Sequence, residues 1–93
     1  MNKNIEIHQD LVKQAMDITN NLLRRTGKDV WDGHTQVSKA MKEVQVYIKA
    51  MSVPLLFCEI SNTPLPQDII DRVQKSINNL KVAVETELLV MAN

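Results

Sequence analysis

The sequence predicts an all-α protein: an antiparallel, up-down-up bundle of three helices that forms a single domain over residues 1–93. Three observations lead to this prediction. Apolar residues recur every three or four positions along three long segments, which is the spacing of one helix face. Short stretches containing glycine or proline separate these segments, and long helices joined by short loops pack side by side in opposite directions. A chain of 93 residues also has no room for a second core.

The first predicted helix runs from about Asn4 to Thr26. Its arginines, Arg24 and Arg25, lie near its end, where positive charge complements the helix dipole. Gly27 follows and is expected to end the helix in the left-handed conformation. The apolar residues fall within about half of the helical wheel and are Ile7, Leu11, Val12, Ala15, Met16, Ile18, Leu22 and Leu23.

The second helix is expected to begin near Asp29 or Asp32, because either aspartate could be its N-cap. A start at Asp29 would leave a tight connection of about three residues. Pro54 removes a backbone donor and clashes with the turn before it. Since the apolar spacing continues past Pro54, we favour one kinked helix. The alternative is a break at 52–53 followed by a separate short helix over 54–60.

Apolar residues lie on two opposite faces of this second helix, about 180° apart. The first row is expected to belong to the core and contains Val37, Ala40, Met41, Val44, Tyr47, Ile48, Met51, Leu55 and Cys58. The second row steps alternately by four and three and contains Val46, Ala50, Val53, Phe57 and Ile60. A helix that is apolar on both sides must be covered on both. A chain this short covers one side easily, so we expect a partner on the second row.

The third helix is expected from about Pro66 to Met91, after a stop signal, Ser-Asn-Thr-Pro-Leu-Pro, at 61–66. Proline is favoured in a first helical turn. Glu87 interrupts the apolar pattern, either as a side chain that reaches solvent or as a buried group that sets register. The expected core row is Ile70, Val73, Ile77, Leu80, Val84 and Met91.

Charge and composition exclude several classes of partner. Eleven basic and eleven acidic residues cancel, so no long-range attraction draws the chain to nucleic acid or an anionic membrane. With only three aromatic residues, base stacking is not expected. No run of about 18 apolar residues is apparent, so we expect no membrane span. The N-terminus lacks an apolar leader segment and Cys58 is the only cysteine, so no internal disulfide can form; we expect a cytoplasmic protein, or one exported by a route that needs no cleaved signal.

The sequence also shows no pattern of reaction chemistry. His8 and His34 are the only histidines, and a metal site needs several ligands at suitable spacing. His8 is expected to be partly buried and hydrogen-bonded locally, and His34 to lie solvated in a first helical turn. No nucleophile–base arrangement or glycine-rich phosphate loop can be defended. We therefore expect no enzymatic activity, cofactor, metal or small-molecule ligand.

The turn Gly27-Lys28-Asp29-Val30-Trp31-Asp32 resembles the Gly–x–Trp–Asp hairpin turn of small flagellar export chaperones, although its glycine-to-tryptophan spacing is longer. The proline-started third helix, with Asn78, Asn79, Leu80, Glu85 and Leu88, is similar to that class in layout. The chain departs from the pattern at Gly33-His34, where a leucine-rich start is expected. The resemblance implies a helical bundle that binds helices of secreted structural proteins and prevents their early assembly.

Together these observations predict a small non-catalytic module that binds another protein by helix-on-helix packing, as a chaperone, adaptor or inhibitor. The alternative is an obligate homodimer in which the second row is the dimer core and no further ligand exists. A third possibility is internal: Ile5 covers the end of the row and the kink turns Phe57 toward the third helix. The residues predicted to bind the partner are Val46, Val53, Leu56, Phe57 and Ile60 on the second helix, with Val82 and Leu89 on the third.

Overall fold

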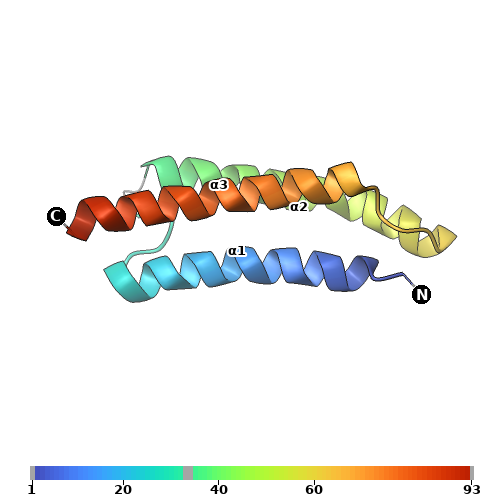
Figure 1. Ribbon diagram of the computed structural model, residues 1–93, viewed down its shortest axis with the longest axis horizontal. Helices are drawn as coiled ribbons and strands as arrows, with labels where there is room; N and C mark the ends of the chain where they lie inside the picture. Colours follow the sequence, from blue (N-terminus) through green and yellow to red (C-terminus); the bar gives the residue numbers. More distant parts are fainter. Residues whose placement is uncertain (1, 33–34, 93) are drawn as a thin grey trace.

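The computed structural model describes residues 2–32 and 35–92 and contains three helices. They are α1 (Asn4–Thr26), α2 (Thr35–Ser61) and α3 (Gln67–Ala92). In Figure 1, α1 and α3 run in one direction and α2 runs in the other, which confirms the up-down-up bundle. The molecule measures 51 × 19 × 17 Å. It is therefore an elongated bundle in which each helix forms one long side.

The core lies along α3, which packs most extensively against α2 and next against α1, while α1 and α2 contact each other least. The core residues contributed by α2 are Val37, Val44 and Met51, which follow one another at intervals of two helical turns. This confirms the predicted phase of the first row, although Tyr47, at the edge of the row, is 40% exposed. The other fully buried positions include Leu11, Ala15 and Leu22 from α1 and Val73, Ile77, Leu80 and Val84 from α3.

Besides Tyr47, three residues predicted to lie in the core are exposed: Met16, Leu23 and Met91. The buried face of α1 is narrower than half of its wheel, because α2 packs only weakly against it. Met16 and Leu23 sit on the uncovered edge, about 100–140° from the line of Leu11 and Leu22. Met91 lies in the last turn of α3, which extends past the start of α2 in Figure 1.

The connection after α1 is longer than predicted, because α2 begins at Thr35 rather than at Asp29 or Asp32. Both carboxylates bind backbone N–H groups of the connection. Asp29 accepts from the N–H of Trp31 at 2.8 Å, and Asp32 accepts from the N–H of Asp29 at 3.3 Å. The buried Val30 fills the end of the bundle, and its carbonyl accepts a hydrogen bond from the Ser38 hydroxyl. The prediction for His34 lies outside the described residues.

The helix ends follow the predicted stop signals. Gly27 has φ +73° and its N–H donates to the Leu23 carbonyl at 2.8 Å, as expected for a left-handed cap. Asn62, with φ +55°, ends α2 in the same way. The Thr63 N–H donates to the Cys58 carbonyl at 2.9 Å, and the Asn62 N–H donates to the Glu59 carbonyl at 3.3 Å. These two bonds form a Schellman motif that satisfies the last carbonyls of α2.

Pro54 lies inside a continuous helix, as favoured from the apolar spacing, and residues 54–60 do not form a separate helix. The final part of α2, yellow in Figure 1, is inclined to its green first part. Proline removes one intrahelical hydrogen bond and crowds the preceding turn, which accounts for a bend at this point.

A buried asparagine joins the start of α1 to the loop between α2 and α3, a contact that the sequence patterns did not predict. The Asn4 side chain is 1% exposed. Its Nδ2 donates to the Thr63 carbonyl at 2.8 Å, and its Oδ1 accepts from the N–H of Leu65 at 2.9 Å. Further along, Gln14 and Gln74 join α1 to α3 through a reciprocal pair of amide hydrogen bonds at 3.2 and 2.8 Å. These polar contacts fix the register of α1 on the other two helices.

Candidate interaction surface

The second row of α2 lies on the molecular surface along its full length. Val46, Val53, Phe57 and Ile60 are between 58% and 74% exposed, and Ala50 is exposed with them. Leu56, beside the row, is exposed to a similar degree. This follows from the phase of the helix, because Val44 and Met51 are buried and the second row lies on the opposite side. The structure thus gathers the five α2 residues of the predicted surface into one stripe.

The alternative in which the chain covers its own second row is wrong for this fold. Ile5 is exposed, and the start of α1 is held by Asn4 against Thr63 and Leu65. Phe57 does not turn toward α3 at the bend, since two-thirds of it is exposed. Five large apolar side chains exposed to this extent present on the order of 500 Å², the upper part of the range for the largest patch on a monomer.

Val82 and Leu89 are also exposed, but they lie on a different part of the molecule. Because α2 and α3 are antiparallel, Val82 lies beside the N-terminal half of α2, where it lines a groove with Lys39, Ala40 and Glu43. Ala40 and Val53 are separated by 13 residues of helix, about 20 Å. Ala40 is only six residues, about 9 Å, from Val46, so Val82 lies toward the Val46 end of the second row and far from its Phe57 end. Leu89 lies two turns beyond Val82, farther still from Phe57.

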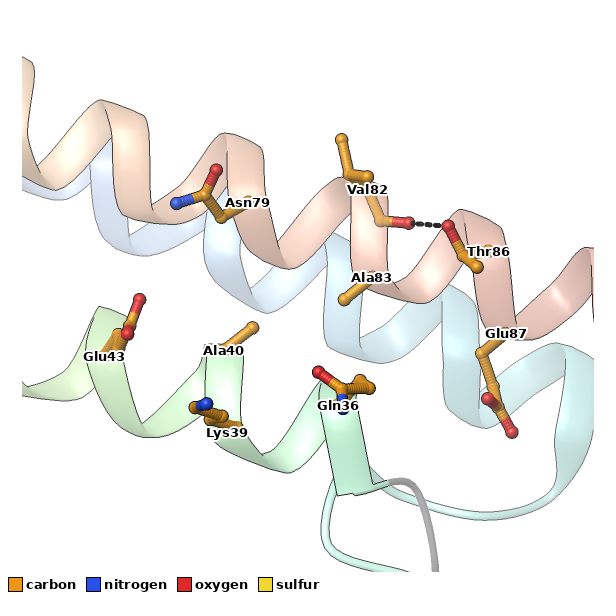
Figure 2. Close-up of a pocket in the computed structure, with 9 residues that line it drawn as sticks. All are labelled: Gln36, Lys39, Ala40, Glu43, Asn79, Val82, Ala83, Thr86 and Glu87. Atoms are coloured by element: carbon orange, nitrogen blue, oxygen red, sulfur yellow. Dashed lines mark hydrogen bonds between the residues drawn. The ribbon is translucent and has the colours of Figure 1, made fainter.

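The groove between α2 and α3 has a volume of about 410 Å³ and faces away from α1 (Figure 2). Ala40 and Ala83 point toward one another across its floor, whereas Val82 points outward. The Thr86 hydroxyl donates to the Val82 carbonyl at 2.8 Å, so its polar group is satisfied within α3. Glu87 is half-buried at the end of the groove. The walls mix amides, charged groups and short apolar groups.

The described residues hold no group of three or more His, Cys, Asp or Glu side chains that could bind a metal ion. His8 is half-buried, as expected, and borders a shallow depression on α1 with Val12 and Met16. Cys58 is half-buried on the first row. The expectations that the chain is not an enzyme and needs no cofactor stay predictions.

By length and composition, α2 could cross a membrane, although its sequence was not expected to contain a membrane span. An 18-residue stretch of this helix has a mean hydropathy of 1.3, and 11% of the stretch is buried. These two criteria are weak evidence, because core helices of water-soluble proteins meet them as well. The low buried share shows that much of the apolar character of α2 lies on its exposed side.

The fold and this surface define a class, an all-α three-helix bundle with one helix that is apolar on two faces. Compared with protein families, curated proteins and solved structures, the chain matches none. The resemblance of its first turn to flagellar export chaperones therefore stays a prediction.

Proposed function

We propose that this protein is a non-catalytic binding module whose second row docks against a helix of another protein chain. The observation that carries the proposal is the exposure of Val46, Val53, Phe57 and Ile60 in one continuous stripe on a folded helix. Alternating steps of four and three residues are the spacing with which one helix packs along another. A helix is thus the element that fits the stripe best.

The strength of such a contact follows from the buried area. Fully burying a side chain of this kind contributes about 1.5–3 kcal/mol. Five side chains, each about two-thirds exposed, would contribute roughly 5–10 kcal/mol, against association costs of about 4–15 kcal/mol. The partner helix buries a comparable apolar surface and contributes a similar amount, so the balance favours a specific contact that can still dissociate. A chaperone, adaptor or inhibitor that releases its partner needs a contact of this moderate strength.

The test is photo-crosslinking in the cells that produce the protein. Replacing Phe57 with a photoreactive phenylalanine analogue places the reactive group in the second half of the exposed stripe. Lys13, exposed on α1, is the control position. We expect a protein adduct of defined mass from position 57, lost when Val53→Lys is added, and none from position 13. Absence of a protein adduct at position 57 would refute the proposal.

A further inference from the structure

We infer that the occupant of the second row is the same row of a second copy of this chain, packed antiparallel around a two-fold axis near Val53. The inference rests on the proposed function, since it names the helix that docks there. Side-chain size along the row and the order of charges along α2 favour this orientation. The surface area that two rows would bury is large enough for a dimer.

Side-chain size increases along the row. Val46 and Ala50 occupy its first half, and Phe57 and Ile60 occupy its second half, with Leu56 beside them. Antiparallel packing places the small half of one copy against the large half of the other, so that the two surfaces interlock. Parallel packing would oppose large residues to large and small to small, which crowds one end and leaves gaps at the other. The row is therefore complementary to itself in one direction only, as a two-fold interface requires.

Charge along α2 changes sign in the same direction. Lys39, Lys42 and Lys49 are exposed before Val53, with Glu43 among them, and give this part of α2 a net charge of +2, whereas the exposed Glu59 follows Val53. Exposed Asp68 lies farther along the chain, in the first turn of α3. Antiparallel packing brings the lysine-bearing end of one α2 toward the acidic end of its partner. Parallel packing would set like charges side by side, which is unfavourable.

The surface that two such rows would bury is sufficient for a dimer that dissociates. Two rows of about 500 Å² each, extended by the exposed edge of Tyr47 and the lysine stems, reach the lower end of specific interfaces, about 1,200 Å² in total. One copy has a surface of 6403 Å², so each would bury roughly a tenth of it, the usual share for a small protein. We expect a dimer that separates on dilution, in which a foreign helix competes with the second copy for the row.

The first experiment measures molar mass by size-exclusion chromatography with light scattering over a wide range of protein concentration. Full-length wild type is expected at dimer mass, shifting toward monomer on dilution. Val53→Lys with Phe57→Glu should weaken association at least tenfold with helicity unchanged by circular dichroism. The matched control is Val82→Lys, an exposed valine outside the row, which should remain dimeric. If the double variant loses its fold, Ile60→Gln at the exposed end of the row provides the milder test.

The second experiment determines orientation in a Cys58→Ala background. Val46→Cys and Ile60→Cys are made separately, mixed and oxidised mildly. If the packing is antiparallel, we expect a higher yield of the mixed disulfide between the two variants than of either homodisulfide. An excess of homodisulfides would overturn the antiparallel arrangement.

If the wild-type protein is monomeric at every concentration, the inference that a second copy occupies the row is wrong, whatever the result for the variants. If position 57 then crosslinks to a different protein, the proposed function survives and only this inference fails. If the monomer instead sediments with vesicles of neutral and anionic phospholipid through the second row, and position 57 forms no protein adduct, both proposals fail.

Discussion

Replacing Asn4 with alanine is expected to destabilise the protein more than any other polar substitution in its N-terminal region. Asn4 is almost completely buried, and its amide donates to the Thr63 carbonyl and accepts from the N–H of Leu65. Alanine removes both hydrogen bonds. Because Leu65 is buried, its N–H would then lack a partner and would be shielded from water.

The loss in free energy of unfolding can be worked out from these two hydrogen bonds. Each hydrogen bond contributes about 1 kcal/mol net, and a buried donor left unsatisfied costs about 1–3 kcal/mol. Thr63 is exposed, so water can replace the bond to its carbonyl in part. The expected loss is about 2–4 kcal/mol, a large share of a typical total of about 5–15 kcal/mol. For a domain of this size, that loss lowers the melting temperature by roughly 10–25 °C.

Urea unfolding followed by circular dichroism measures this loss, and Asn2→Ala is the matched control. Asn2 also donates through its side-chain amide, to Asn62 at 3.1 Å, but this bond is exposed and should contribute less than about 0.5 kcal/mol. Equal unfolding midpoints for the two variants would refute the role assigned to Asn4.

The variant Asn4→Asp separates the donor from the acceptor. At neutral pH its carboxylate can accept from Leu65 but cannot donate to Thr63, whereas the protonated acid can do both. Its pKa in the folded state should therefore lie above the unfolded value of about 3.9. The penalty relative to wild type is then present at pH 7 and decreases as the pH falls toward 4. A penalty that does not change between pH 7 and 4 would contradict this reasoning.

Three further substitutions test the helices, each by thermal melting followed by circular dichroism. Val44→Asp places an unpaired carboxylate in the core and should cost several kcal/mol, enough to unfold the chain; a melt close to wild type would mean that the first row is not core. Pro54→Ala should be neutral or stabilising by up to about 3 kcal/mol, because Pro54 lies inside a continuous helix, and a clear fall in melting temperature would contradict that continuity. Gly27→Ala should cost about 1–2 kcal/mol through its left-handed backbone alone, since nothing lies within 4 Å of an added Cβ. An unchanged melt would argue against that cap.

The number and arrangement of the helices were predictable because the apolar residues recur with helical spacing in all three segments. The spacing of Val37, Val44 and Met51 fixed the buried side of α2, and the position of the second row followed from it. Gly27 was identifiable because few residues adopt the left-handed conformation easily, and the turn at 61–66 because its prolines and polar residues stop a helix.

What the sequence could not show depends on contacts between distant segments. Asn4 resembles an ordinary first-turn polar residue, and its burial arises only when it meets residues 63–65, about 60 positions away. The exposure of Met16 and Leu23 depends on how closely α1 approaches α2, which the periodicity of one helix does not encode. The start of α2 was placed too early because aspartate also binds N–H groups within a connection, as Asp29 and Asp32 do here.

Folding and binding are carried by opposite sides of the same helix, and this separation is what makes the second row testable. Val44 and Met51 face α3 and the core, whereas Val46 and Val53, each two positions farther along, face outward. A polar substitution on the outward side changes no core contact, so it should alter association while leaving the free energy of unfolding of the monomer nearly unchanged. A substitution on the inward side removes the fold, and any contact with a partner is lost with it. Measuring stability and association on the pair Val44→Asp and Val53→Lys therefore distinguishes an interface from ordinary core on a single helix.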